Sequence, residues 1–363
     1  MSPSEFEIYI LVPSLFPSGP TKGAIAIANG LASLGLKVHL VAIKGRGLNP
    51  NSLISHDVDV FCMEAASFFS ALLEIRKLRR MIGSRASNSE TKVKILSMGF
   101  TADFMSLFLG KHVKKAASVR GDLTMNYSMD YGWIGKLLAA AHYAMFPTFD
   151  SVIAMNQEMQ TKLRNIGCKR VRMISNFLNE EDYKAIQTPL VDAHMKQLVF
   201  LGSLSERKRP MLLLSAFKQL MTESPLVSLV FIGDGPLRGR LQDKIKEHGL
   251  LRVSLTGFLS QPMDVVRSSS VMILPSVSEG VPRAVMEALF VGTPCVTRNL
   301  PTNDGLIEEG FNGALFDEDA ELVPAIKRAL KLSGDTRTTG KLLPDKFRQS
   351  AGVQQYFDEL VRL

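Results

Sequence analysis

The sequence has few of the residues that build disulfide networks and metal centres. Its 363 residues include three cysteines and six histidines, and neither type occurs at the short spacings that are typical of metal sites. The three cysteines, Cys62, Cys168 and Cys295, are far apart and odd in number. We therefore expect no bound metal and no disulfide framework, and we expect the cysteines to be buried thiols in a reducing compartment.

Long apolar runs are also missing. No stretch reaches the roughly 18 uninterrupted apolar residues that span a bilayer, and the longest candidate, Trp133–Phe146, is interrupted by Lys136 and His142. This segment could lie on a membrane surface but could not easily cross the bilayer. The first residues carry no basic leader and form an apolar run of strand length only, so we expect no secretory signal and a cytoplasmic location.

The net charge of +8 is concentrated in the first half of the chain, where the densest basic clusters are Arg76–Arg80 and Lys111–Lys115. These clusters are either solvated surface charges or a surface that attracts anionic lipid headgroups or a diphosphate-bearing acceptor. No interleaved aromatic residues and no nucleic-acid motif accompany them, which argues against a nucleic-acid partner.

Short β-branched runs alternate with helical segments along the whole chain. This alternation predicts an α/β protein with doubly wound parallel sheets, and the length suits two domains. Residues 187–196 lack a clean period and precede a new strand, so we place the linker there and expect domains at 1–190 and 191–345, followed by a terminal helix at 346–363. The expected strands are 8–12, 38–43, 93–98, 152–154, 198–201, 228–232, 253–256 and 271–274.

Two glutamates, Glu279 and Glu287, lie in a loop and in the helix that follows it. The apolar run Val271–Leu274 predicts a buried strand before the loop, and Pro282 suits the first position of a helix that ends at about Val291. Free backbone N–H groups and the helix dipole at that start favour an anion. The glutamates are either a cap and a solvated face, or contacts to the sugar and ribose of a nucleotide sugar.

The segment Ser-x-x-Glu-Gly-x-Pro at 276–282, with Glu-Ala-Leu at 287–289 and Gly-x-Pro at 292–294, matches the Glu-x7-Glu signature in detail. In this it resembles the retaining glycosyltransferases with a GT-B fold, family four of the sequence classification, and among them the bacterial enzymes of surface-polysaccharide and lipopolysaccharide assembly. The resemblance implies two Rossmann-like domains that face each other across a cleft. Residues 1–190 would lie on the acceptor side, residues 191–345 would bind a nucleotide-diphospho-sugar, and the helix at 346–363 would pack back toward the N-terminal domain.

The resemblance assigns donor-side roles in the second domain, with Glu279, Lys208 and Arg207 as the expected catalytic residues. Lys208 matches the lysine of the family motif Gly-Arg-Leu-x-x-x-Lys-Gly, which holds the donor diphosphate, whereas Ser203 replaces the motif arginine. Arg207 could supply the missing guanidinium. Glu279 would contact the sugar, and Glu287 the ribose hydroxyls. Further donor contacts are expected at Gly233, Phe258, Gly280 and Val281.

In the first domain the candidates are Gly19, Gly23 and Arg120. The two glycines follow the first strand and open a helix, either as a plain loop or at a position close to a phosphate or sugar. Arg120 stands where the family has a histidine, and because arginine is always protonated it cannot act as a general base. It could bind a phosphate or carboxylate, or pair with Asp122. In this family the leaving phosphate itself is thought to take the acceptor proton, so the replacement is compatible with activity.

Asp57-Val-Asp59 has the letters of the metal-binding motif of the other main glycosyltransferase fold, but it starts a strand-like run in the first domain. We therefore expect transfer without a metal or other cofactor, with positive side chains and a helix dipole in place of the cation. The expected partners are a nucleotide-diphospho-sugar, a glycan acceptor linked to a lipid diphosphate, and the anionic inner face of the cytoplasmic membrane. No nucleic-acid partner is expected.

Two other functions fit the same residues. A sugar-nucleotide epimerase or a phosphorylase could use the same framework but would not extend a lipid-linked sugar. A non-catalytic scaffold that still binds nucleotides is consistent with the departures at Ser203 and Arg120, although the retained glutamates and lysine argue against it. The chain lacks the dinucleotide fingerprint of a dehydrogenase, because the Gly-Asp-Gly at 233–235 is followed by a proline and has no third glycine in the required place.

Overall fold

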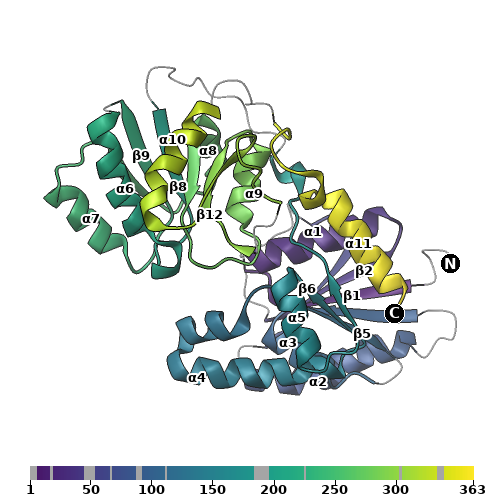
Figure 1. The fold of residues 1–363 in the computed structure, drawn as a ribbon. Coiled ribbons are helices and arrows are strands. Elements are labelled where there is room, and N and C mark those ends of the chain that lie inside the picture. The colour runs from purple at the N-terminus through teal and green to yellow at the C-terminus, as the bar shows by residue number, and fades with distance from the viewer. Residues whose placement is uncertain are drawn as a thin grey trace. The chain divides into compact units, whose positions relative to one another are not determined.

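The computed structural model describes residues 6–16, 19–44, 54–65, 68–86, 92–110, 113–183, 196–224, 226–301, 305–332 and 339–363. The chain divides into two compact units, Met1–Phe177 with Gln349–Leu363, and Leu178–Arg348 (Figure 1). The first unit therefore ends earlier than the expected boundary at residue 190. Leu178 already belongs to the second unit, because its N–H donates to the Phe347 carbonyl at 2.9 Å. The expected linker at 187–196 lies almost entirely outside the described residues.

The first unit is built on a seven-stranded parallel sheet in the order β3-β2-β1-β4-β5-β6-β7. Its strands are β1 (Phe6–Ser14), β2 (Lys37–Lys44), β3 (Val58–Cys62), β4 (Lys92–Ser97), β5 (Lys114–Ser118), β6 (Ser151–Ala154) and β7 (Val171–Met173). Its helices are α1 (Gly19–Ser33), α2 (Phe68–Ala86), α3 (Phe100–Ser106), α4 (Leu123–Met145), α5 (Gln157–Asn165) and α11 (Gln349–Val361).

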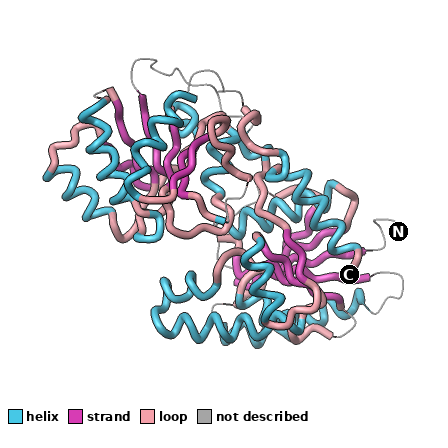
Figure 2. Tube along the Cα trace, in the orientation of Figure 1, coloured by secondary structure: helices cyan, strands magenta, loops and turns pink. Residues whose placement is uncertain are grey.

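Helices cover both faces of this sheet (Figure 2), which explains why β1 is apolar from Ile8 to Val12. Successive side chains of a strand point to opposite faces. Ile8, Ile10 and Val12 pack with buried residues of α1 and α11, whereas Tyr9 and Leu11 pack with those of α2 and α3. A strand buried on both faces must be a continuous hydrophobic run, which is how the parallel sheet could be predicted.

The second unit contains a six-stranded parallel sheet in the order β10-β9-β8-β11-β12-β13. Its strands are β8 (Lys196–Leu201), β9 (Val227–Ile232), β10 (Val253–Gly257), β11 (Val271–Leu274), β12 (Cys295–Arg298) and β13 (Gly313–Phe316). Its helices are α6 (Pro210–Glu223), α7 (Arg238–Glu247), α8 (Met263–Ser268), α9 (Arg283–Phe290) and α10 (Leu322–Leu332). The predicted helix at Pro282–Val291 is α9, which is shorter at each end because Pro282 keeps an extended backbone as its N-cap residue.

The strand order reverses once in each sheet, next to β1 in the first unit and next to β8 in the second. Chains leaving the two strands that flank such a reversal turn to opposite faces, so the loops part and leave room for a ligand at the carboxyl edge. In the first unit the reversal lies between β1 and β4, and in the second between β8 and β11. These two edges are where binding residues should be sought.

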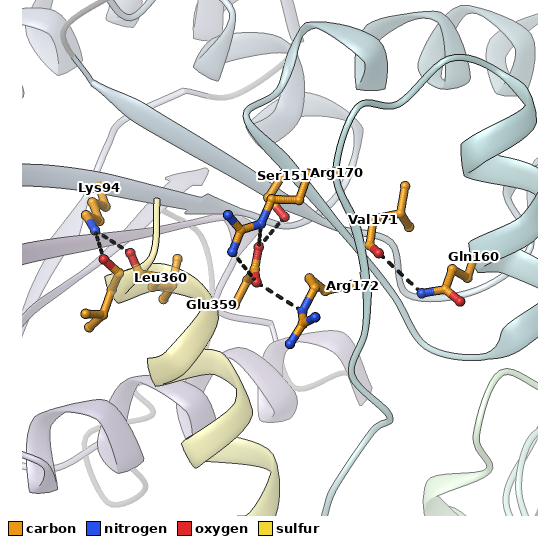
Figure 3. Close-up of polar contacts among 9 residues, drawn as sticks. Lys94, Ser151, Gln160, Arg170, Val171, Arg172, Glu359 and Leu360 are labelled. Atoms are coloured by element: carbon orange, nitrogen blue, oxygen red, sulfur yellow. Dashed lines mark hydrogen bonds and ion pairs between the residues drawn. The ribbon is translucent and has the colours of Figure 1, made fainter.

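The C-terminal helix α11 is attached to the first unit through a buried carboxylate (Figure 3). Glu359 is 1% exposed and accepts hydrogen bonds from Ser151 at 2.6 Å and from Arg170 at 2.6 and 2.8 Å. Arg172 lies 3.2 Å from the same carboxylate. At the end of the helix, Lys94 of β4 donates to the Leu360 carbonyl at 2.5 Å. The last helix of the chain is thus part of the first unit's core.

Replacing Glu359 by alanine should lower the free energy of unfolding of the first unit by about 3 kcal/mol, because it removes the acceptor shared by two arginines and a buried hydroxyl. The measurement is urea-induced unfolding followed by far-ultraviolet circular dichroism. Asp358→Asn is the control, since the Asp358 carboxylate accepts from Gln354 on the helix surface and its loss should change the stability by less than about 0.5 kcal/mol. Equal effects of the two variants would contradict the assignment.

Candidate active site

The loops after β8 and β11 lie side by side because these strands pair directly in the sheet of the second unit. The first loop contains the 3-10 turn Glu206–Lys208, and the second passes through Glu279 into α9. A hydrogen bond from the N–H of Val277 to the Arg207 carbonyl, 3.0 Å long, joins them. Residues about 70 positions apart in the sequence therefore meet at the carboxyl edge of the sheet, beside the point where the strand order reverses.

Glu279 is held between two cations. Its Oε1 lies 2.5 Å from Lys208 Nζ, and its Oε2 lies 3.1 Å from Arg207 Nη1. The Glu279 and Lys208 side chains are only 9% and 12% exposed. Burial opposes ionisation of Glu279, but the charges of Lys208 and Arg207 hold the pKa of its carboxyl below the ordinary value. Burial lowers the pKa of Lys208, and Glu279 opposes that shift. Each buried charge is thus stabilised by its partner.

The third cation of this turn has a different position. Arg209 is in the left-handed region, with φ 52°, and its guanidinium pairs with Asp319 at 2.5 Å. Arg207 instead turns toward the loop after β11, where it donates to the Ser278 carbonyl at 2.8 Å. The turn therefore contributes Arg207 and Lys208 to the site, while Arg209 links two surface segments of the second unit.

Glu287 is buried on the first turns of α9 and has two partners that sequence reasoning missed. The Tyr183 hydroxyl donates to Glu287 Oε1 at 2.6 Å, and Arg283 Nε lies 3.1 Å from the same oxygen. Burial, together with the Glu287 charge, raises the pKa of Tyr183, so its hydroxyl remains a donor. The spacing of four between Arg283 and Glu287 was a usable signal on a helix, whereas nothing in the sequence pointed to Tyr183.

The remaining donor-side candidates line the same carboxyl edge. Ser203 follows β8, and its hydroxyl lies 3.2 Å from that of Ser205. Phe258 follows β10 and is 84% exposed. Gly233 follows β9 with φ 130°, and a Cβ there would lie 2.0 Å from the Gly202 carbonyl oxygen, so a close backbone approach explains this glycine. Gly280 and the buried Val281 directly precede α9.

A pocket of about 280 Å³ lies at the corresponding edge of the first unit, lined by residues after β1, β4 and β5 and by parts of α1 and α4. Arg120 lines it and is tied to the Asn176 side chain at 3.5 Å. A Cβ on Gly23 would lie 3.3 Å from the Arg120 guanidinium, whereas Gly19 has open space around it. The structure therefore brings Gly23 and Arg120 together. Gly19 is the first residue of α1.

The alternative pairing of Arg120 with Asp122 does not occur. Asp122 is the N-cap residue of α4, where its carboxylate accepts from the Met125 N–H at 3.0 Å, and it also lies 3.4 Å from Lys162. Three further polar side chains of the pocket were not singled out from the sequence, because they lie far apart along the chain and carry no motif. They are Asp103, Tyr127 and His142.

Two expectations about composition can be compared with the described residues. Cys168 and Cys295 are buried as expected, but Cys62 is exposed, because it lies in β3 at the edge of the sheet, where the last residues are uncovered. Among the described residues no group of three or more potential metal-binding side chains was found. No helix within the described ranges has the length and apolar character needed to cross a membrane.

Known proteins resemble this chain in both sequence and fold. The sequence model of the family "Glycosyl transferases group 1" matches residues 184–341. An Escherichia coli UDP-Gal:alpha-D-GlcNAc-diphosphoundecaprenol alpha-1,3-galactosyltransferase is 31% identical over 32% of this chain and 31% of its own length. An uncharacterized glycosyltransferase of Haemophilus influenzae is 24% identical over 83% of each chain. The segments matched in the first four curated relatives cover between 31% and 48% of those proteins' lengths.

Solved structures extend the likeness of fold to the whole chain. The Anabaena protein HepE, solved in complex with UDP-glucose, superposes with a TM-score of 0.73 over 98% of this chain and 100% of its own. The sequence identity is 18%, so this likeness concerns the fold. It supports the GT-B arrangement of two parallel-sheet α/β units that the sequence predicted.

The Lys208–Glu279 pair should show strong energetic coupling in a double-mutant cycle with Lys208→Met and Glu279→Gln. Removing Glu279 leaves the Lys208 charge without its carboxylate, and removing Lys208 leaves Glu279 with Arg207 as its cation. Removing both partners avoids these costs, so we expect a coupling of about 2 kcal/mol in the unfolding of the second unit. The same cycle on Lys244 and Glu247, an exposed pair 2.7 Å apart on α7, is the control and should show no measurable coupling. Independent effects at positions 208 and 279 would show that the pair does not form.

Proposed function

We propose that this protein is a retaining, metal-independent glycosyltransferase, because residues 184–341 match the family model of the group 1 glycosyl transferases and the chain has a GT-B fold. It transfers a hexosyl group from a nucleotide-diphospho-sugar to a lipid-linked glycan acceptor in bacterial cell-surface polysaccharide biosynthesis. The observation that carries the proposal is the buried Arg207–Lys208–Glu279 cluster beside the start of α9, at the edge where the strand order of the second unit reverses.

The cluster suits a donor that contains a diphosphate next to a sugar. Lys208 and Arg207 are donors to the diphosphate oxygens, and the backbone N–H groups of Gly280 and Val281 add to the positive end of the α9 dipole. A bound diphosphate shares these cations with Glu279, whose carboxylate then accepts hydrogen bonds from the sugar hydroxyls. Because the cations are already in place, they offset the charge that develops on the departing nucleotide without a large reorganisation.

The proposed transfer needs no protein base. The bond from the anomeric carbon to the phosphate oxygen breaks, and the electron pair leaves with the nucleoside diphosphate. The acceptor oxygen forms its bond to the anomeric carbon on the same face, and its proton passes to the leaving phosphate oxygen. This route is compatible with Arg120, which cannot accept a proton.

Glu287 is proposed to bind the ribose hydroxyls of the donor. Its Oε1 is held by Tyr183 and Arg283, which orients the carboxylate and leaves Oε2 as the acceptor for a diol. Tyr183 and Arg283 are therefore positioning residues in this proposal. The exposed Phe258, which follows β10, lies at the same edge and is assigned to the nucleotide side.

The first unit is proposed to hold the acceptor. Arg120 and Gly23 lie at its pocket, where a guanidinium favours an anionic group such as a lipid-linked diphosphate. The name of the E. coli relative includes a diphosphoundecaprenol acceptor, which supports a lipid-diphosphate acceptor for this chain.

Helix α4 supports contact with a membrane. It contains a non-helical residue at Gly132, and around this break it exposes large apolar side chains. Those of Trp133, Leu137, Ile134 and Met129 are 73%, 62%, 48% and 50% exposed. Helix α2 exposes the basic cluster Arg76–Arg80, and both helices pack against α3. An apolar surface and a basic surface on one unit fit the anionic inner face of the cytoplasmic membrane.

The donor assignment predicts that one sugar nucleotide from a panel of UDP-, GDP- and dTDP-sugars will raise the melting temperature, with or without excess EDTA. Saturating ligand at 100 times its dissociation constant adds about 2.7 kcal/mol of stability. Lys208→Ala and Glu287→Ala should abolish the shift, while Lys244→Ala on the exposed surface of α7 should leave it intact. Loss of the shift in EDTA would refute metal independence, and no response to any sugar nucleotide would remove the donor assignment.

The membrane assignment can be tested with the chain's single tryptophan, because Trp133 lies in the exposed part of α4. Vesicles rich in phosphatidylglycerol should shift its fluorescence to the blue and sediment the protein at low salt, and high salt should weaken both effects. Leu137→Glu should reduce binding, whereas Leu251→Glu, at a position that is 96% exposed in the second unit, is the matched control. Failure to sediment with these vesicles, or equal effects of the two variants, would argue against this surface.

A further inference from the structure

A chain of buried hydrogen bonds ends at the pocket of the first unit. Asp103 of α3 and His142 of α4 are each 1% exposed, and His142 Nε2 lies 2.7 Å from Asp103 Oδ2. His142 Nδ1 lies 2.9 Å from the Tyr127 hydroxyl. All three residues line the pocket, yet none has a part in the donor site or in the transfer step proposed above.

The partners of these groups set the direction of each hydrogen bond. Ser97 donates to Asp103 Oδ1 at 2.6 Å, so the carboxylate is held at both oxygens. Burial raises the pKa of the Asp103 carboxyl, while the hydrogen bonds from His142 and Ser97 favour its ionised form. With both oxygens held by these partners we assign the ionised form. An ionised carboxylate can only accept, which makes His142 Nε2 the donor and leaves Nδ1 as an acceptor. Tyr127 must then donate its proton to Nδ1. The lone pairs of the Tyr127 oxygen are left to accept a hydrogen bond from a ligand in the pocket.

The break in α4 is what brings Tyr127 and His142 together. The backbone of Gly132 is non-helical, with φ 60°, and the helix folds back on itself there. Gly135 then lies against the backbone of Tyr127, where a Cβ would come within 1.8 Å of the Tyr127 carbonyl oxygen. Phe100 and Phe146 pack around the imidazole, with ring centroids 5.2 and 4.9 Å from it. These contacts fix the imidazole, which is the hydrogen-bond partner of the Tyr127 hydroxyl.

The rest of the pocket combines apolar walls with the polar side chains of Arg120, Asn126, Ser14, Ser118 and Thr21. Val12, Met98, Leu123 and Phe146 supply apolar surface, while Arg120 supplies hydrogen-bond donors. A carboxylate or phosphate finds no donor at the Tyr127 oxygen. A sugar hydroxyl can donate to Tyr127, another hydroxyl of the same ring can accept from the Asn126 amide, and the C–H face of the ring can pack on the apolar wall. This leaves the Arg120 guanidinium for the acceptor's diphosphate.

From this geometry we infer that the pocket binds a sugar ring of the acceptor, with Tyr127 accepting a hydrogen bond from one of its hydroxyls and the Asp103–His142 pair holding Tyr127 in that orientation. This inference rests on the proposed function. It adds which part of the acceptor the pocket holds and which residue contacts that part. Tyr127 is the ligand contact, and Asp103 and His142 are positioning residues.

Two substitutions that preserve the shape of the side chains distinguish sugar binding by Tyr127 from a purely structural role of the hydrogen-bonded chain. Tyr127→Phe removes the accepting oxygen and should weaken sugar binding about fivefold. In Asp103→Asn the amide can present its NH₂ group to Nε2, which moves the imidazole proton to Nδ1 and turns the tyrosine proton toward the pocket. The sugar hydroxyl must then turn to accept from Tyr127 and can no longer accept from its previous partner, so sugar binding should weaken, although the pocket keeps its volume. Nitrogen-15 spectra of His142 report the change from the Nε2–H to the Nδ1–H tautomer.

The binding experiment uses the full chain and methyl α-glycosides of glucose, galactose, mannose and N-acetylglucosamine as probes, observed by saturation-transfer NMR at millimolar concentration. At least one glycoside should bind the wild-type protein and bind Tyr127→Phe and Asp103→Asn more weakly. Tyr131→Phe is the matched control, since Tyr131 is 59% exposed on the same helix and its hydroxyl is not part of the pocket lining.

Thermal stabilisation by the sugar-nucleotide panel is measured on the same variants and separates this inference from the proposed function. One outcome overturns the inference and leaves the donor assignment standing. In it a sugar nucleotide stabilises the protein, but the glycosides bind wild type and Tyr127→Phe equally or do not bind wild type at all. Glycoside binding that depends on Tyr127, without a response to any sugar nucleotide, supports the sugar pocket and overturns the proposed transferase. An Nδ1–H tautomer of His142 in the wild type overturns the assigned direction of the Tyr127 hydrogen bond.

Discussion

The reversal of strand order in each parallel sheet is the constraint on which the functional sites of this protein depend. The carboxyl ends of parallel strands lie at one edge of the sheet. At the reversal the chain leaves the two flanking strands toward opposite faces, so the loops after these strands diverge at that edge. In the second unit the reversal between β8 and β11 brings the turn with Lys208 beside the loop with Glu279. In the first unit the reversal between β1 and β4 opens the pocket that Arg120 lines. Both sites follow from topology before any side chain is considered.

Buried charges at the edge of the second unit are paired before a ligand arrives. A buried lysine or glutamate alone would be costly, but Lys208 and Glu279 neutralise each other, and Arg207 adds a second cation. Glu287 is likewise held by Tyr183 and Arg283. Such pairs keep the side chains oriented. In the proposed mechanism the bound diphosphate shares Lys208 and Arg207 with Glu279, so the site need not reorganise in order to bind the diphosphate.

Helix α4 combines features that usually belong to separate elements. Its inner surface supplies Leu123, Tyr127 and His142 to the pocket, and its outer surface exposes Trp133 and Leu137. Both arise from one break at Gly132, since a straight helix could not place Tyr127 against His142. In the proposed function this arrangement puts the membrane contact and the acceptor sugar on the same helix, which suits an acceptor whose lipid remains in the bilayer.

Local sequence was sufficient where the signal was local. Each expected strand is present. The strands β1 and β11 show why they could be predicted, since each contains a short run of buried apolar residues that is followed by a loop and a helix. Strands that are short or carry charged residues, such as β5 with Lys114 and Lys115 and the three-residue β7, escaped prediction. The division of the chain after Phe177 could not be predicted from local sequence, because the hydrogen bond of Leu178 with Phe347 joins segments that are distant in the chain.

The sequence by itself determined the α/β class, the motif carrying Glu279 and Glu287, and the match of Lys208 to a phosphate-binding lysine, since each depends on neighbouring residues. Only the tertiary structure decided that Arg207, and not Arg209, joins Lys208 at Glu279, and that Tyr183 orients Glu287. It also decided that Asp103, Tyr127 and His142 form one hydrogen-bonded chain. The physical reason is that a hydrogen bond depends on separation and angle in space, and these are set by strand order and helix breaks that no short stretch of sequence encodes.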